Sequence, residues 1–123
     1  MLLGIKNCSR GTVLGSRIRL ADGTWTRLAG LLNRARLDPG EGLWIMPSSA
    51  IHTMGMRFSI DAVFLEKMQA EKRRRVKRIY HCLAPWRMTG FVWGAESVLE
   101  LPAGTVEASK TEVGDELEIQ RQE

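Results

Sequence analysis

The residues whose chemical types could support catalysis or binding are concentrated in one stretch, SSAIHTMGMRFSIDAVFLE, at positions 48–66. This stretch contains His52, one of the two histidines in the chain, followed by Arg57 and Asp61. An imidazole that can take up a proton, a permanent cation and a carboxylate are the groups that build a general acid–base site. Such a site requires the three side chains to lie on one accessible face, so the element that carries them decides the interpretation.

Apolar residues occupy every second position of the stretch, namely Met54, Met56, Phe58, Ile60, Ala62 and Phe64. A sustained period of two predicts a half-buried β-strand. Strict alternation then directs His52 toward the core, as a structural histidine that holds one ring nitrogen against a backbone carbonyl. A β-bulge at Gly55 would instead move His52 to the side of Arg57 and Asp61, and the sequence leaves both registers open.

Arg57 and Asp61 cannot pair directly on a strand, because four residues span about 13 Å at about 3.3 Å each. Each is expected to meet a partner on a neighbouring strand, and a solvent-facing ion pair is the structural alternative. A serine hydrolase built on Ser48 or Ser49 is disfavoured, because the chain has no GxSxG turn. An enzyme that uses His52 as its base and Arg57 as electrostatic support is the third hypothesis, after a binding module and an anion-binding surface.

Cysteine or metal chemistry would depend on Cys8, His52, His81 and Cys82. Their spacing matches no standard zinc pattern, and neighbouring residues of a strand, such as His81 and Cys82, point to opposite faces. The two cysteines form no CxxC pair, so we expect free thiols in a reducing compartment. We expect no metal site and no cofactor.

One segment carries the basic character of the chain. Six of the 18 basic residues lie there: Lys72, Arg73, Arg74, Arg75, Lys77 and Arg78. The remaining 12 basic residues against 14 acidic residues give a balance of −2. Such a patch could attract nucleic acid or another anionic surface in a salt-sensitive way, although no aromatic side chain is interleaved to stack bases. The alternative is a solvated hairpin or edge strand whose charges oppose aggregation.

A second candidate segment is the loop Ala84-Pro85-Trp86-Arg87, with Trp93 soon after. Tryptophan and arginine are enriched in binding hot spots, although a tryptophan can also cover the end of a barrel. This loop and His52 both lie at predicted strand ends, so we expect them to share one end of the fold. The candidate ligand or partner site then consists of His52, Thr53, Arg57, Asp61, Trp86 and Arg87.

Short apolar runs between turn residues predict the elements that position these side chains. Besides the strand described above, strands are expected at residues 17–20, 43–46, 76–83, 97–101 and 116–119. A helix capped by Thr24 or Asp22 and ending near residues 33–36 is expected from its apolar stripe of Trp25, Leu28, Ala29, Leu31 and Leu32. One helical turn is expected at residues 105–110.

Strands that follow one another without alternating helices predict a mainly β fold, in which the sheet is mostly antiparallel. We expect a compact antiparallel sandwich or barrel with one amphipathic helix packed on it. A chain of 123 residues is long enough to close one hydrophobic core, so residues 1–123 are predicted to form a single domain. A monomer is the default expectation.

The composition, with 44% hydrophobic and 26% charged residues, is typical of globular proteins. No apolar run approaches the roughly 20 residues that cross a bilayer, so we expect no membrane span. The opening residues lack the basic, apolar and small-residue regions of a secretory signal. These features predict a cytoplasmic protein, and export is the alternative that stays open if the start is truncated.

The order of motifs resembles a known family. The blocks are RGTVLGSRIRLADGTWTRLAGLL, LDPGEGLWIMP, IHTMGMRFSIDAVFL, LAPWR, VLELPAG and VGDEL. Together they are similar to the domain-of-unknown-function 192 family, also called uncharacterised protein family 0127, from about Arg10 to Ile119. The resemblance implies a compact β-rich domain with few helices and brings no activity; similar members often carry export signals, and some occur with secretion or pilus loci. Where relatives have an Asp-Gly hairpin, this chain has residues 66–72 without Gly, Pro, Asn or Asp.

Three functions follow from these residues. The first is a non-enzymatic binding or accessory module, whose small polar site at strand ends takes an unknown small ligand or protein partner. The second is nonspecific binding of nucleic acid or an anionic surface through residues 72–78. The third is the enzyme built on His52 and Arg57.

Overall fold

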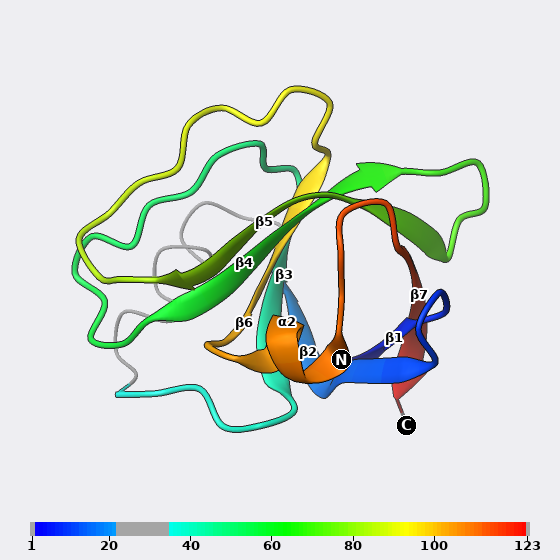
Figure 1. Cartoon of the computed structure of the whole chain (residues 1–123), viewed down its shortest axis with the longest axis horizontal. Helices are drawn as coiled ribbons and strands as arrows, with labels where there is room; N and C mark the ends of the chain where they lie inside the picture. The colour runs from blue at the N-terminus through cyan, green and yellow to red at the C-terminus, as the bar shows by residue number, and fades with distance from the viewer. Residues whose placement is uncertain (1, 22–34, 123) are drawn as a thin grey trace.

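Seven strands form a closed barrel in the computed structural model, which describes residues 2–21 and 35–122 (Figure 1). The elements are β1 (Leu2–Asn7), β2 (Thr12–Ala21), β3 (Glu41–Ile45), β4 (Ile60–Lys67), β5 (Arg73–Leu83), β6 (Ser97–Pro102), α2 (Thr105–Ser109) and β7 (Glu116–Gln122). Their order around the barrel is β1-β2-β3-β6-β4-β5-β7. The mainly β prediction is confirmed.

Most strand pairs are antiparallel, as the sequence predicts, whereas β2 and β3 are parallel. A parallel pair needs a crossover connection between its strands, and the chain between β2 and β3 supplies it. The amphipathic helix predicted between Thr24 and Arg36 falls mainly on residues 22–34, outside the described residues. The predicted helical turn at residues 105–110 is confirmed as α2.

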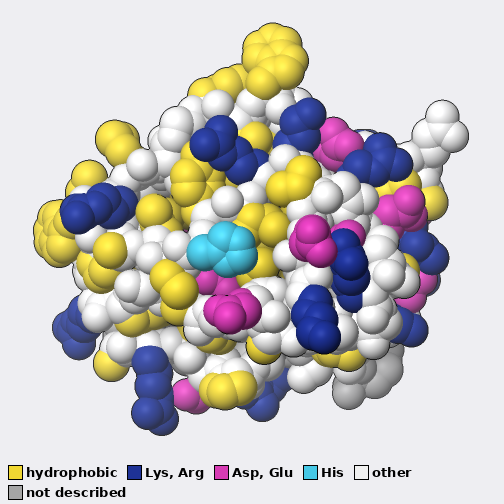
Figure 2. Space-filling model, in the orientation of Figure 1, with side chains coloured by type: hydrophobic (Ala, Val, Ile, Leu, Met, Phe, Trp, Pro, Cys, Tyr) yellow, Lys and Arg dark blue, Asp and Glu magenta, His cyan; other side chains and the backbone are white. Residues whose placement is uncertain are grey.

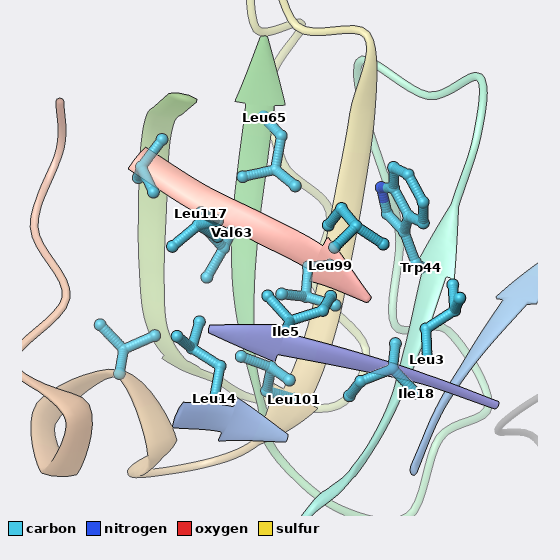
Figure 3. Close-up of a cluster of buried hydrophobic side chains, with 13 residues drawn as sticks. Leu3, Ile5, Leu14, Ile18, Trp44, Val63, Leu65, Leu99, Leu101 and Leu117 are labelled. Carbon is cyan, nitrogen blue, oxygen red and sulfur yellow. The ribbon is translucent and has the colours of Figure 1, made fainter. Parts of the chain in front are cut away.

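The barrel interior is filled by side chains from alternate positions of the strands (Figure 3). Val63 and Leu65 of β4 meet Leu99 and Leu101 of β6 there, all fully buried. Trp44 of β3 belongs to the same cluster, and its indole Nε1 donates a hydrogen bond to Ser97 Oγ at 2.9 Å. Because a buried indole N–H needs a partner, Ser97 lets this large ring occupy the interior.

A second apolar cluster lies on the outer face of the sheet formed by β3, β6, β4 and β5. Its buried strand residues are Ala21, at the end of β2, and Leu43, Ile45, Ile60, Ala62, Phe64 and Val98. Two long loops cover it, since Met56 of the β3–β4 loop (residues 46–59) and Val92 of the β5–β6 loop (residues 84–96) are buried in the same cluster. Figure 1 shows these two loops running beside each other at one end of the barrel.

The long strand predicted over residues 54–64 is wrong in its first half, because β4 begins only at Ile60. Met54 and Gly55 form a turn, which the Met56 N–H closes by donating to the Thr53 carbonyl at 3.1 Å. Gly55 has a φ of 81°, a conformation that glycine adopts at little cost. Gly55 is therefore a turn residue and neither a strand residue nor a bulge.

Candidate functional site

The β3–β4 and β5–β6 loops are joined by backbone hydrogen bonds. The Thr53 N–H donates to the Arg87 carbonyl at 2.8 Å, and the Thr89 N–H donates to the Ile51 carbonyl at 2.9 Å. These bonds flank an antiparallel bridge between His52 and Met88. Side chains directly opposite in such a bridge lie on the same face. His52 and Met88 are both exposed, so they project together into solvent and His52 does not enter the core.

Thr53 holds the two loops together from within. Thr53 is fully buried. Its Oγ1 donates to the Ala84 carbonyl at 2.7 Å and accepts from the Arg87 N–H at 2.9 Å. The Trp86 N–H donates to the Thr53 carbonyl at 3.0 Å. The sequence placed Thr53 in a ligand site, but its polar atoms are used by the loops themselves.

Replacing Thr53 by valine is expected to lower the free energy of unfolding by about 2 kcal/mol, because valine keeps the shape but leaves the Arg87 N–H and Ala84 carbonyl without their partner. Denaturant unfolding measures the change. Thr105→Val is the matched control, because the Thr105 hydroxyl makes no hydrogen bond within residues 2–21 and 35–122. Equal stabilities of the two variants would contradict the role of Thr53 as the link between the loops.

Asp61 is also structural. It is fully buried, and its carboxylate accepts hydrogen bonds from three backbone N–H groups: Cys82 at 2.9 Å, Gly104 at 3.1 Å and Val106 at 2.9 Å. Two of these donors lie at the start of α2, where helical N–H groups have no partner within the helix. Asp61 thus connects β4 with β5 and α2, and it does not join the exposed His52 and Arg57.

The β5 strand contains a bulge opposite Asp61. Ile60 pairs with Leu83 and Ala62 pairs with Tyr80, so His81 and Cys82 together face one residue of β4. Cys82 has a φ of 49°, and both residues of the bulge are exposed. Strict alternation had placed them on opposite faces. Although the bulge exposes both residues, no group of three metal-ligating side chains occurs in the described part of the chain.

The two loops display a group of large hydrophobic side chains. They carry five of the seven large hydrophobic residues that are exposed in the described chain: Met54, Trp86, Met88, Phe91 and Trp93. Trp93 is 81% exposed, and the rings of Phe91 and Trp93 meet edge to face with centroids 6.0 Å apart. Figure 2 shows hydrophobic side chains protruding along the side of the molecule where the loops lie.

We define the loop surface as these five residues together with the exposed polar residues His52, Arg57 and Arg87. Trp86 was predicted from the sequence as part of a site, with Trp93 nearby, whereas Met54, Met88 and Phe91 were not predicted to belong to it. The missed signal is the repetition of large apolar residues at positions 86, 88, 91 and 93 in a segment punctuated by Pro85, Gly90 and Gly94. Such punctuation opposes a strand, so these side chains could not all enter a core.

A shallow, open depression of about 530 Å³ adjoins the loop surface. Its walls are Pro47, Ser48, Ser49, Ala50, Ala95 and Glu96. Two backbone bonds fix its shape: the Ser48 N–H donates to the Glu96 carbonyl, and the Val92 N–H donates to the Ser49 carbonyl, each at 2.8 Å. Neither His52 nor Arg57 lines it.

The basic segment is largely paired with carboxylates. Arg73 contacts Glu116 and Glu118, Arg74 contacts Glu96, and Arg75 and Lys77 both contact Glu66, at N···O distances of 2.9–3.8 Å. Arg74 is buried and also lies over the Trp44 ring at 5.3 Å. Within the described residues, only Lys72 and Arg78 of the six have no carboxylate partner. The local positive potential is therefore much smaller than the sequence suggests.

A polar network closes the opposite side of the barrel. Asp115 accepts hydrogen bonds from Asn7 Nδ2 and Arg10 Nε, each at 3.0 Å, and from the Glu112 N–H at 2.9 Å. Burial acts to raise the pKa of Asp115, but these hydrogen bonds together lower it. The pKa of Arg10 is raised, chiefly by its hydrogen bond to Asp115. Because these polar groups bond one another, we interpret the network as a structural feature and not as a candidate site.

Glu100 of β6 is the one strongly perturbed carboxyl among the described residues. It points to the outer cluster between Leu43 of β3 and Ala62 of β4, and it is 5% exposed. No described residue gives its carboxylate a hydrogen bond or an ion pair. Burial raises the pKa of Glu100 to about 7. The group is therefore held in its protonated form in mildly acidic solution.

Comparisons with known proteins agree on a family and a fold. The family described as DUF192, Uncharacterized ACR, matches residues 5–119. A UPF0127 protein from Thermococcus sibiricus is 28% identical over 122 residues, and the match covers 95% of this chain and 75% of that protein. A UPF0127 protein from Pyrococcus furiosus is 31% identical over 121 residues, and the match covers 94% of this chain and 97% of that protein. The crystal structure of a putative transcription regulator from Sinorhizobium meliloti 1021 has a TM-score of 0.77 and 22% identity, covering 94% of this chain and 90% of that one. That likeness shows the fold alone.

Proposed function

This protein belongs to the DUF192 family, and we propose that it is a non-enzymatic binding module that docks a protein partner through the loop surface. One observation carries the proposal: five large hydrophobic side chains are held in solvent on two loops that are hydrogen-bonded to each other. Family membership supplies no activity, so the argument rests on the surface of this chain.

Grouped exposed apolar side chains are unusual on a globular protein and mark interaction surfaces. Tryptophan, methionine, phenylalanine and arginine are the residue types enriched at protein interfaces, and the loop surface contains all four. Tryptophan and arginine in particular provide most binding hot spots. The composition of the loop surface therefore fits a protein interface better than a solvated loop.

The loops are also well ordered for binding. Thr53 and Thr89 are buried between them and bond the two backbones, while Met56 and Val92 are anchored in the outer cluster. A surface that is already in its bound shape loses little conformational entropy on association. This arrangement supports docking by preformed loops.

An enzyme is less well supported. A general base works in a concave site that orients the substrate and limits water. His52 and Arg57 are exposed residues of the β3–β4 loop, and neither lines the depression beside it. Asp61, the carboxylate nearest in sequence, is occupied by three backbone N–H groups.

The proposal predicts that Trp86→Ser/Trp93→Ser abolishes binding. We expect a displayed library of random peptides, selected on the wild-type protein, to yield binders whose affinity falls by about 30-fold or more on this variant, because truncation of a hot-spot tryptophan removes buried contact area. Fluorescence anisotropy of the recovered peptides measures the loss.

Val13→Ser/Val113→Ser is the control variant, because both valines are exposed apolar residues away from the two loops. It should bind the recovered peptides as the wild type does. Circular dichroism and thermal unfolding must show that both variants fold. Peptides that bind the tryptophan variant unchanged, or a failure to recover any peptide, would overturn the proposed function.

A further inference from the structure

We infer that the partner contributes an acidic segment with large apolar anchors, so that the loop surface recognises carboxylates at its edge and apolar side chains at its centre. This inference rests on the proposed function and specifies its partner. The charge distribution of the loops carries it.

The loops contain no carboxylate over residues 46–59 and 84–95. They carry Arg57 and Arg87, both exposed, and His52 beside Met88. Arg57 makes no ion pair with the described residues, and among them the Arg87 guanidinium bonds only the neighbouring Trp86 carbonyl, at 3.4 Å. Two guanidinium groups are thus available to a ligand, and guanidinium pairs with carboxylates in a two-pronged geometry.

Two carboxylates at the borders of the loops are paired with cations. Glu96, at the end of the β5–β6 loop, accepts from Arg74 Nε at 2.9 Å. Glu66 contacts Arg75 and Lys77, and the aliphatic end of Lys77 lies beside Gly94. Residues 46–59 and 84–95 contain two arginines and no other permanently charged side chain, so the loops carry a net charge of +2, which favours an acidic partner over a basic one.

The apolar part of the partner has a place to bind. The depression of about 530 Å³ is lined by residues of both loops, and three of its six lining residues are apolar: Pro47, Ala50 and Ala95. Large side chains of the partner can fill it while others pack on Trp86 and Trp93. Hot spots typically consist of anchors that enter such hollows within a polar rim.

The same observations favour a protein over a lipid surface or nucleic acid. Anionic membranes and nucleic acids are bound by many unpaired cations, each adding to a salt-sensitive attraction. In the basic segment next to these loops, Arg73, Arg74, Arg75 and Lys77 are paired with glutamates. Two loop arginines among apolar side chains instead suit a limited number of carboxylates.

The experiment compares peptide selections on two baits, the wild-type protein and Arg57→Glu/Arg87→Glu. We expect wild-type binders to be more acidic than the starting library and to combine acidic residues with aromatic or leucine side chains. Their affinity for the charge-reversed bait should fall by about tenfold or more, and that bait should select basic peptides. Arg19→Glu/Arg121→Glu, which reverses two exposed arginines on β2 and β7, is the control and should keep the wild-type preference.

The outcomes separate the two proposals. Peptides that need Trp86 and Trp93 but have the charge of the starting library would overturn the acidic partner and leave the proposed function standing. Absence of any tryptophan-dependent peptide would overturn both. Tryptophan-dependent binding to phosphatidylcholine vesicles containing phosphatidylserine, without recovered peptides, would assign the surface to lipid and overturn both. Concentration-dependent dimerisation that disappears in Trp86→Ser/Trp93→Ser would assign it to a second copy of the chain and overturn the acidic partner.

Discussion

Replacing Asp61 by alanine is expected to lower the free energy of unfolding by about 4 kcal/mol, because it leaves three partly or fully buried N–H donors without an acceptor. Bonds to a charged acceptor are stronger than those between neutral groups, so a large value is expected. The loss reaches three elements at once, since the carboxylate joins β4 to the β5 bulge and to the start of α2. Urea unfolding followed by circular dichroism measures it.

Asp61→Asn should cost less than alanine but well over 1 kcal/mol, because an amide retains one acceptor oxygen and presents an N–H₂ group toward a donor. Asp38→Ala is the matched control. Its carboxylate is 46% exposed and pairs with Arg36 at the surface, where such pairs contribute about 0–1 kcal/mol. If Asp61→Ala were as mild as Asp38→Ala, the carboxylate could not be the junction described above.

Glu100 is expected to make the protein less stable as the pH rises. Its pKa is about 7 in the folded chain, where burial disfavours the charged form, against an ordinary value of 4.5. Between these values the unfolded chain has released the proton while the folded chain retains it, so stability falls with increasing pH. This loss of stability is absent below about pH 4.5 and complete above about pH 7. The difference between the two pKa values of Glu100 corresponds to about 3 kcal/mol.

Glu100→Gln should therefore be more stable than the wild type above pH 7. Its free energy of unfolding should decrease much less than that of the wild type between pH 4.5 and pH 7. Equilibrium unfolding of both proteins at a series of pH values measures the difference. Glu107→Gln, an exposed glutamate of α2, is the control and should follow the wild-type profile. Parallel profiles for wild type and Glu100→Gln would show that the buried carboxyl does not titrate in this range.

Much of the fold could be predicted from local patterns. The strands at β3, β6 and β7 and the turn of α2 were expected close to their observed positions, since short apolar runs were bounded by Gly, Pro and Asp. β2 and β5 are longer than expected. β5 begins at Arg73, which pairs with Glu116 and Glu118 of β7, and β2 begins at Thr12, which pairs with Asn7 of β1; both contacts join segments that are distant or only loosely patterned in the sequence. β1 was not predicted, although Leu3 and Ile5 are buried in the barrel.

The candidate site was predicted by residue type but not by geometry. Trp86 and Arg87 lie on an exposed loop, as predicted. His52 and Arg57 also lie on an exposed loop, although the alternation had placed Arg57 within a strand and directed His52 toward the core. Thr53 was assigned to the same site, yet it is buried, because its hydroxyl satisfies backbone groups of the opposite loop that the sequence cannot pair. The basic segment shows the same limit, since its glutamate partners lie on β4, on β7 and at the end of the β5–β6 loop.

The sequence alone determined the class of the fold and the residue types available for binding, because alternating apolar residues and turn residues act over a few neighbouring positions. Only the tertiary structure decided which side chains meet. The barrel closes β7 on β1 and brings residues 46–59 beside residues 84–96, contacts that depend on packing between distant segments. For that reason Asp61 became a structural junction, four basic residues became ion pairs, and a set of hydrophobic side chains remained at the surface.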